Sequence, residues 1–210
     1  MEPATTRREL RKQDRREAIV DAARDSFLEH GYAGTSMSGL LKTLGGSKAT
    51  LWSYFRSKEE LFAAVVERLC ASVRLELRNI LDSSGGLEPG LIAFCRQFLQ
   101  TIGSPDAVIT WRMVVGESGR FPELGRIFYE RAAGFTETTL AAYLARHVAS
   151  GALRQEDPLE MAQALIALCT GRHNRRLLWG AEPEEPSVID DQARRFVDLF
   201  LRAYGTAARQ

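Results

Sequence analysis

The side chains whose types most clearly suggest a chemical function lie between His30 and Lys58. Every charged side chain in this stretch is basic, if the histidine is neutral: Lys42, Lys48, Arg56 and Lys58. Lysine and arginine bind phosphate oxygens, and serine and threonine hydroxyls bind phosphates or base edges. The chemistry that this set can perform is the recognition of a polyanion.

The net charge of the whole chain does not indicate a polyanion-binding protein, but the distribution of charge along the chain does. The 210 residues include 28 Lys and Arg and 27 Asp and Glu, for a net charge of +1. Residues 1–58 carry a net charge of +4, whereas residues 59–210 carry −3. This asymmetry favours a polyanion-facing surface in the N-terminal part of the chain.

Catalysis is not expected. The sequence contains no nucleophile-elbow, P-loop, dinucleotide-binding or zinc-protease pattern. Its histidines also lack the spacing of metal ligands: His30, His147 and His173. We therefore expect no catalytic residue, no metal site and no cofactor.

The composition predicts a cytoplasmic protein. The N-terminus is polar and lacks the apolar core of a secretion signal, and no apolar stretch approaches the roughly 20 residues that span a membrane. Three widely separated cysteines lie in apolar helical patterns, namely Cys70, Cys95 and Cys169. They are expected to be reduced packing residues.

Apolar residues recur at spacings of three and four throughout, which predicts an all-α fold of about nine helices. One helix, Pro122–Ala149, is expected to kink near Gly134. The others are expected at about Asp14–His30, residues 35–44, Lys48–Phe55, Lys58–Asp82, Leu91–Ile102, Ala107–Glu117, Pro158–Trp179 and residues 187–204.

Residues 35–55 have the proportions of a helix-turn-helix, with a glycine-containing turn before a short second helix. If Leu51 and Phe55 face the core, then Ala49, Trp52 and Ser53 face the opposite way, with Thr50 on a flank. A small, polar face with one aromatic side chain suits approach to base edges in a major groove. An ordinary helical hairpin is the alternative, and it leaves the exposed Trp52 without a cause.

The segment Thr35–Leu61, TSMSGLLKTLGGSKATLWSYFRSKEEL, preceded by Ala22–Tyr32, AARDSFLEHGY, resembles the DNA-binding head of TetR-family transcriptional regulators. The match covers about Arg16–Phe62. It implies a homodimer that binds a (pseudo)palindromic double-stranded DNA operator and, in most members, a small ligand in a helical C-terminal domain. The residues at which it implies DNA contacts are Thr35, Lys48, Ala49, Thr50, Trp52, Ser53, Tyr54 and Lys58.

The resemblance also implies how the molecule is divided and regulated. Residues 1–14 would form a basic flexible arm, 15–58 the DNA-binding domain, and 59–210 the effector-binding and dimerisation domain. Dimerisation would use helices 158–179 and 187–204, and repression is the family default. An effector that alters the separation of two recognition helices, about 34 to 36 Å, would release the operator.

Four positions depart from the family pattern. Ala49 stands where Gly is usual, Trp52 where Tyr is usual, and Ser53 where His or Asn is usual. Because these three lie on the predicted reading face, the operator cannot be inferred from relatives. Gly46 replaces an aliphatic residue and so removes a packing contact in the turn.

The C-terminal part resembles the AefR-like branch in the segments Trp111–Leu124, Asp157–Ala162 and Gly171–Leu178. Aromatic and soft side chains there could line a pocket for a small apolar or aromatic effector. The candidates are Phe94, Phe98, Trp111, Met113, Phe128, Tyr143 and His173. Core packing is the alternative for each aromatic residue, and His173 or Arg172 could instead bind an anionic or polar effector. The main alternative function is a TetR-fold protein whose C-terminal domain binds a protein partner.

Overall fold

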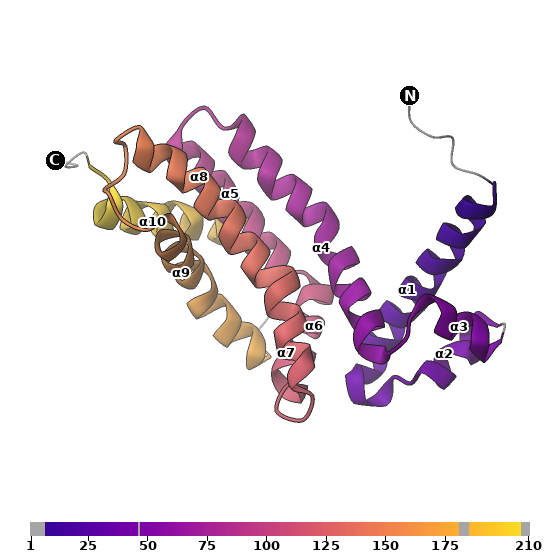
Figure 1. Cartoon of the computed structure of the whole chain (residues 1–210). Coiled ribbons are helices and arrows are strands. Elements are labelled where there is room, and N and C mark those ends of the chain that lie inside the picture. Colours follow the sequence, from indigo (N-terminus) through magenta and orange to yellow (C-terminus); the bar gives the residue numbers. More distant parts are fainter. Residues whose placement is uncertain (1–6, 46, 181–184, 207–210) are drawn as a thin grey trace. The chain divides into compact units, whose positions relative to one another are not determined.

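A computed structural model describes residues 7–45, 47–180 and 185–206, and it is all-helical in these ranges apart from an isolated bridge between Leu153 and Gly205. Figure 1 shows the helices in chain order. Their bounds are α1 Arg7–Gly34, α2 Met37–Leu44, α3 Lys48–Tyr54, α4 Lys58–Ser83, α5 Leu87–Ile102, α6 Pro105–Glu117, α7 Pro122–Phe128, a π-helical turn Tyr129–Ala133, α8 Gly134–Ala149, α9 Pro158–Leu178 and α10 Pro186–Tyr204. The expected all-α fold class is confirmed. The expected run Pro122–Ala149 corresponds to α7, the π turn and α8 together.

The first helix starts at Arg7, seven residues before the expected start near Asp14. The second half of the predicted arm 1–14 is therefore helical. Its residues are mostly strong helix formers, and Gln13 donates a hydrogen bond to Glu17 one turn later at 2.7 Å. The predicted stop at Gly31 is confirmed, since this residue has φ 73° and ψ 177° and interrupts the helix.

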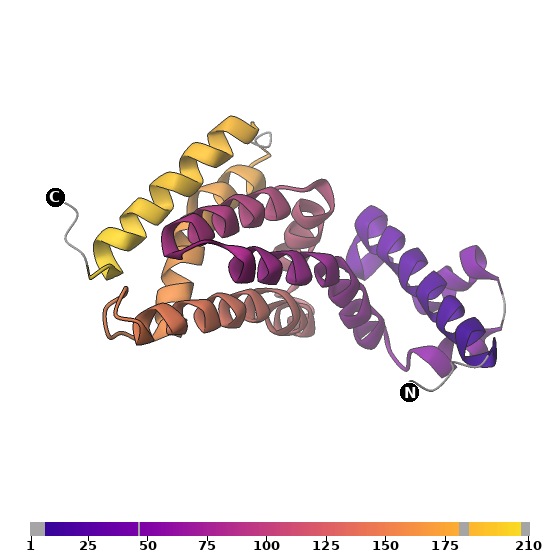
Figure 2. The same ribbon diagram turned by 90° about the horizontal axis from the view of Figure 1, so that it is seen from above.

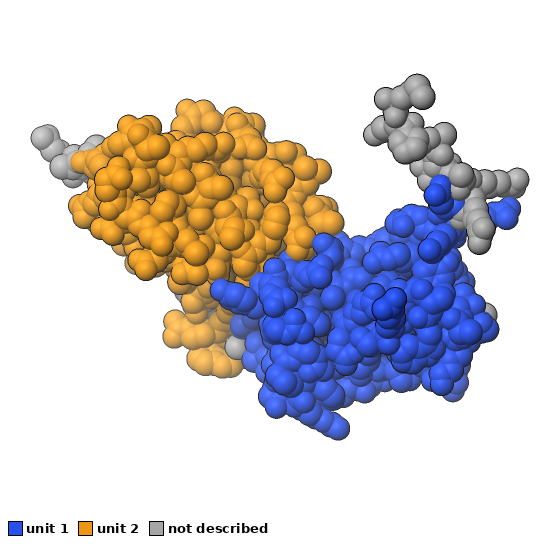
Figure 3. Space-filling view, in the orientation of Figure 1, with its two compact units in different colours: residues 1–69, 109–131 blue, residues 70–108, 132–210 orange. Residues whose placement is uncertain are grey.

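The residues group into two compact units (Figure 3). The first unit combines the chain up to Leu69 with Ile109–Arg131, and the second combines Cys70–Val108 with the chain from Ala132 onward. The predicted functional boundary between residues 58 and 59 thus differs from the boundary of the packed units. The difference arises because residues of α6 and α7 pack against the predicted DNA-binding head.

Aromatic rings form the centre of the first unit. Phe27, Tyr32 and Phe62 contact one another with centroid distances of 5.4 to 5.7 Å, and Phe121 lies 5.1 Å from Tyr32. Such edge-to-face and offset arrangements add to the stabilisation from burial alone. This cluster joins the end of α1, the start of α4 and the segment before α7 in one core.

The second unit is a helical bundle in which α10 packs on α5 and α9, and α8 packs on α9 (Figures 1 and 2). Its core includes two free cysteines, Cys95 and Cys169. A hydrogen bond to Cys169 and burial raise the pKa of the Cys95 thiol. Among the described residues, no helix has the length and apolar character needed to cross a membrane.

Candidate DNA-binding site

Two serine caps build the helix-turn-helix. The Ser36 hydroxyl accepts a hydrogen bond from the Gly39 amide at 3.0 Å and begins α2, and the Ser47 hydroxyl accepts one from the Thr50 amide at 3.1 Å and begins α3. Each cap satisfies an amide that has no partner within the helix. Between them, α2 ends at Gly45, whose φ of 62° favours glycine.

Arg15 of α1 holds the end of α2. Its Nη2 atom donates hydrogen bonds to the Leu44 carbonyl at 3.3 Å and the Gly45 carbonyl at 2.7 Å. The last carbonyls of a helix carry partial negative charge, so a guanidinium there is favourable. Gly46 itself lies outside the described residues.

The helix α3 has one buried and one exposed face, as its periodicity predicts. Leu51 and Phe55 are only 2% and 1% exposed, whereas Trp52 is 39% exposed. The other outward residues are Lys48, Ala49, Thr50 and Ser53, with the half-buried Tyr54 at the edge. Six of the eight predicted DNA-contacting residues therefore lie on one short helix.

The remaining two predicted contacts are engaged inside the head. Thr35 is 2% exposed, and its hydroxyl donates to the Gly31 carbonyl at 2.9 Å. The Lys58 ammonium donates to the carbonyls of Tyr32 at 2.7 Å and Thr35 at 3.1 Å. Burial lowers the pKa of Lys58. Contact of these two side chains with DNA stays a prediction.

Glu117 is a residue that sequence reasoning missed. From the end of α6, its two carboxylate oxygens accept hydrogen bonds from the amides of Tyr32 at 2.8 Å and Ala33 at 2.7 Å. A Cβ atom on Gly31 would lie 2.7 Å from the same carboxylate, so the glycine leaves room for it. Nothing in the local pattern signals a partner 84 residues away.

Positive side chains outside α3 extend the candidate surface of the first unit. Arg11 and Lys12 of α1 and Lys42 of α2 are exposed, as is Arg56 after α3. No acidic side chain lies between His30 and Lys58, the stretch that holds Lys42 and Arg56. Such a surface suits the phosphate contacts that supply most sequence-independent DNA affinity.

The predicted effector residues are divided between the two packed units. Phe94 and Phe98 stack on each other with centroids 5.9 Å apart in the core of the second unit. Three others belong to the first unit, namely Trp111, Met113 and Phe128. The His173 side chain lies outside the described residues. The role of these residues in effector binding stays a prediction.

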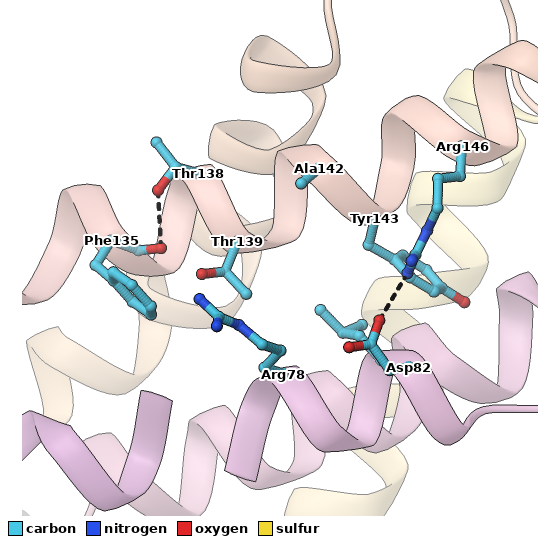
Figure 4. A pocket seen from close by; sticks show the side chains of 9 residues that line it. Arg78, Asp82, Phe135, Thr138, Thr139, Ala142, Tyr143 and Arg146 are labelled. Atoms are coloured by element: carbon cyan, nitrogen blue, oxygen red, sulfur yellow. Dashed lines mark hydrogen bonds and ion pairs between the residues drawn. The ribbon is translucent and has the colours of Figure 1, made fainter. Parts of the chain in front are cut away.

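A pocket of about 350 Å³ lies in the second unit, between the last turns of α4 and the face of α8 that runs from Phe135 to Arg146 (Figure 4). Of the predicted effector residues, Tyr143 lines it. The full lining is Arg78, Leu81, Asp82, Phe135, Thr138, Thr139, Ala142, Tyr143 and Arg146. The pocket combines apolar side chains with two cations, which spacing along the sequence does not indicate.

Comparison with protein families decides the identity of the fold. The profile described as bacterial regulatory proteins, tetR family, matches residues 19–65. The profile of the C-terminal domain of AefR-like transcriptional repressors matches residues 89–206, more than half of the chain. The chain belongs to the TetR family of transcriptional regulators. Members of this family bind DNA and form dimers.

Individual relatives of this TetR regulator are also named as regulators. The regulator YhgD of Bacillus subtilis (strain 168) is 31% identical over 192 residues, which cover 90% of this chain and 95% of YhgD. The repressor Rv1474c of Mycobacterium tuberculosis (strain ATCC 25618 / H37Rv) is 25% identical over 181 residues, covering 84% and 89%. The solved structure of the flavonoid-responsive regulator FrrA is 34% identical, covers 93% of this chain and all of that one, and superposes with a TM-score of 0.82.

Proposed function

We propose that this TetR regulator is a ligand-responsive repressor that acts in the cytoplasm, binds a palindromic operator as a homodimer and is released by a small-molecule effector. The observation that carries the proposal is the exposed face of α3, with Trp52, Lys48 and Thr50 directed away from the core. A half-exposed tryptophan amid small and polar residues suits contact with DNA better than contact with water.

Dimerisation is proposed through α9 and α10, where large apolar side chains remain exposed in the single chain. The exposed fractions are 39% for Leu159, 36% for Leu168, 40% for Val188 and 43% for Leu199. Pairing with a second copy across a two-fold axis would remove these surfaces from water. The dimer would present two copies of α3 to successive major grooves.

A small apolar or aromatic effector is proposed because FrrA, a relative that this chain covers over its full length, is named a flavonoid-responsive regulator. The pocket between α4 and α8 offers Leu81, Phe135 and Ala142 to such a ligand. Helix α4 begins four residues after α3 and reaches the pocket with its last turns. A ligand that favours one position of α4 would therefore change operator affinity, typically by 5- to 150-fold.

The decisive experiment is selection of genomic DNA fragments by the purified protein at two salt concentrations. We expect an enriched inverted repeat. Salt-sensitive binding without sequence preference would contradict a specific operator. On the selected site, Lys48→Ala should weaken binding and reduce the salt slope by about 1, while Trp52→Ala should weaken it without changing that slope. Arg154→Ala, an exposed change in the second unit, is the matched control.

The alternative is that the C-terminal domain binds a protein partner. The response of the operator complex to added compounds distinguishes this alternative from release by a small molecule. A flavonoid such as naringenin and other small aromatic compounds would be titrated into the complex. Release by a small molecule supports the proposed function. Release only by a protein from the same cell would favour the alternative.

A further inference from the structure

We infer that the pocket between α4 and α8 binds an organic anion with an aromatic body, and that Arg78 binds its negative group. This inference rests on the proposed function and deepens it by naming the class of effector. It depends on the charges, the free hydrogen-bond donors and the apolar surfaces that line the pocket.

The charges of the lining do not cancel. Asp82 is the acidic lining residue, and its carboxylate already accepts a hydrogen bond from Arg146 Nη2 at 3.1 Å. The guanidinium of Arg78 forms no ion pair or hydrogen bond with any residue that the structure describes. One positive charge is therefore left for a ligand.

A second cation lies one turn away on α4. The guanidinium carbon of Arg74 is 4.5 Å from the centre of the Phe135 ring, and that of Arg78 is 5.8 Å from the same centre. Arg74 has a further interaction of its own and is not part of the pocket lining, so Arg78 is the cation that remains available to a ligand.

Two polar groups of the pocket can donate hydrogen bonds to a ligand, the Arg78 guanidinium and the Thr139 hydroxyl. In Figure 4 the Arg78 side chain extends from α4 toward Phe135 and Thr139 of α8. Within the described part of the chain the Thr139 hydroxyl has no hydrogen-bond partner, whereas the Tyr143 hydroxyl already donates to the Gly86 carbonyl at 3.0 Å. A guanidinium with a nearby hydroxyl matches a carboxylate or sulfonate, which accepts several hydrogen bonds at once.

The rest of the lining suits an aromatic body. The Phe135 ring, the Leu81 side chain and the Ala142 methyl group provide apolar surface beside the cation. The volume of about 350 Å³ lies at the small end of the range of ligand pockets. These dimensions favour a compact ligand with one charged group.

The probe for the test is 8-anilinonaphthalene-1-sulfonate, an aromatic anion that fluoresces when bound. Its matched neutral partner is N-phenyl-1-naphthylamine, which has the same rings without the sulfonate. Both would be titrated into the full-length protein and into Arg78→Gln, Arg78→Lys and Arg154→Gln. Arg154 is an exposed arginine of the second unit outside the pocket lining, so it serves as the control.

We expect saturable binding of the sulfonate that Arg78→Gln weakens about tenfold, the effect of losing one charge-assisted contact. Arg78→Lys should retain part of the affinity, and Arg154→Gln all of it. The neutral amine should bind the protein and Arg78→Gln alike. Equal sulfonate affinity in the protein and in Arg78→Gln, or equal loss with Arg154→Gln, would overturn the inference.

Operator binding measured on the same preparations separates this inference from the proposed function. If a specific operator is bound but the sulfonate ignores Arg78, the ligand class is wrong and the regulator stands. If the sulfonate depends on Arg78 but no operator can be selected, the pocket assignment holds and the proposed function fails.

Discussion

A single carboxylate connects α6 to the start of the helix-turn-helix. Glu117 binds the amides of Tyr32 and Ala33, which follow the break at Gly31 and lead into α2. Removing it leaves two backbone donors without their charged acceptor. We predict that Glu117→Ala lowers the free energy of unfolding by about 1–2 kcal/mol, measured by urea denaturation.

Two variants test whether the effect belongs to this contact. Glu117→Gln keeps one acceptor oxygen and should lose less than the alanine variant. Glu130→Gln breaks only an exposed pair with Arg126 at 3.4 Å, and should change stability by less than about 0.5 kcal/mol. Equal losses for Glu117→Ala and Glu130→Gln would show that the two amides do not depend on Glu117.

Gly31 combines an unusual backbone angle with a close neighbour. Its φ of 73° is unfavourable for any residue with a Cβ atom, and that atom would meet the Glu117 carboxylate at 2.7 Å. Gly31→Ala should therefore lower the unfolding free energy by about 1–2 kcal/mol or more. Gly116→Ala, in open space within α6, should instead raise it by about 0.5–1 kcal/mol. Thermal unfolding of both variants checks the opposite signs.

Residues whose position depends on helical period were predictable, and residues whose partners are remote were not. The inward Leu51 and Phe55 and the outward Trp52 follow from 100° per residue along α3. The roles of Thr35, Lys58 and Glu117 depend on hydrogen bonds to the turn after Gly31. Spacing in the sequence does not reveal which of several polar side chains reaches such a turn.

At the scale of elements, α3 is notable for being short. Its seven residues are too few for an isolated helix to be stable, so its cap and its packing must maintain it. We predict that Ser47→Ala lowers the unfolding free energy by about 1 kcal/mol and weakens operator binding. Urea denaturation and a mobility-shift titration measure the two effects.

Substitutions at and near the cap separate its role from a direct contact with DNA. Ser47→Asp preserves the capping acceptor but adds a negative charge, so it should keep stability while weakening DNA binding. Ser38→Ala, on the exposed side of α2, should change neither quantity by much. A Ser47→Ala variant with unchanged stability would show that the cap contributes little.

Element type was more predictable than element ends. Apolar spacing predicted every long helix. Helix α1 nevertheless extends back to Arg7 through a mostly charged stretch of good helix formers, where no apolar spacing marks the helix. The expected kink near Gly134 is a π-helical turn over Tyr129–Ala133, directly before that glycine. A single extra residue per turn leaves too weak a signal in the apolar pattern to be located more closely.

For the whole molecule, the first packed unit combines two segments that are distant in sequence, which domain boundaries drawn along the chain do not show. The segment Ile109–Arg131 packs with the head although it lies 40 residues beyond Leu69. Phe121 belongs to the aromatic cluster around Tyr32, and Arg131 forms an ion pair with Glu67 of α4 at 2.5 Å. Long-range packing of this kind leaves no mark in local periodicity, so the predicted boundary after residue 58 followed the motif alone.

Dimerisation provides the last prediction. Leu199 of α10 is 43% exposed in the single chain, and the proposed two-fold pairing would bury it. Leu199→Glu should place a charge in an apolar interface and shift the protein from dimer to monomer in sedimentation velocity. Operator affinity should then fall by more than about tenfold, because a monomer binds one half-site only.

A matched change on α4 tests the location of that interface. Leu75 is 62% exposed, so Leu75→Glu adds the same charge to a surface that the proposed dimer leaves in water. This variant should sediment as the unchanged protein does and bind the operator equally well. If Leu199→Glu remained dimeric while Leu75→Glu dissociated, the two-fold interface would lie on α4, and the exposed leucines of α9 and α10 would need another partner.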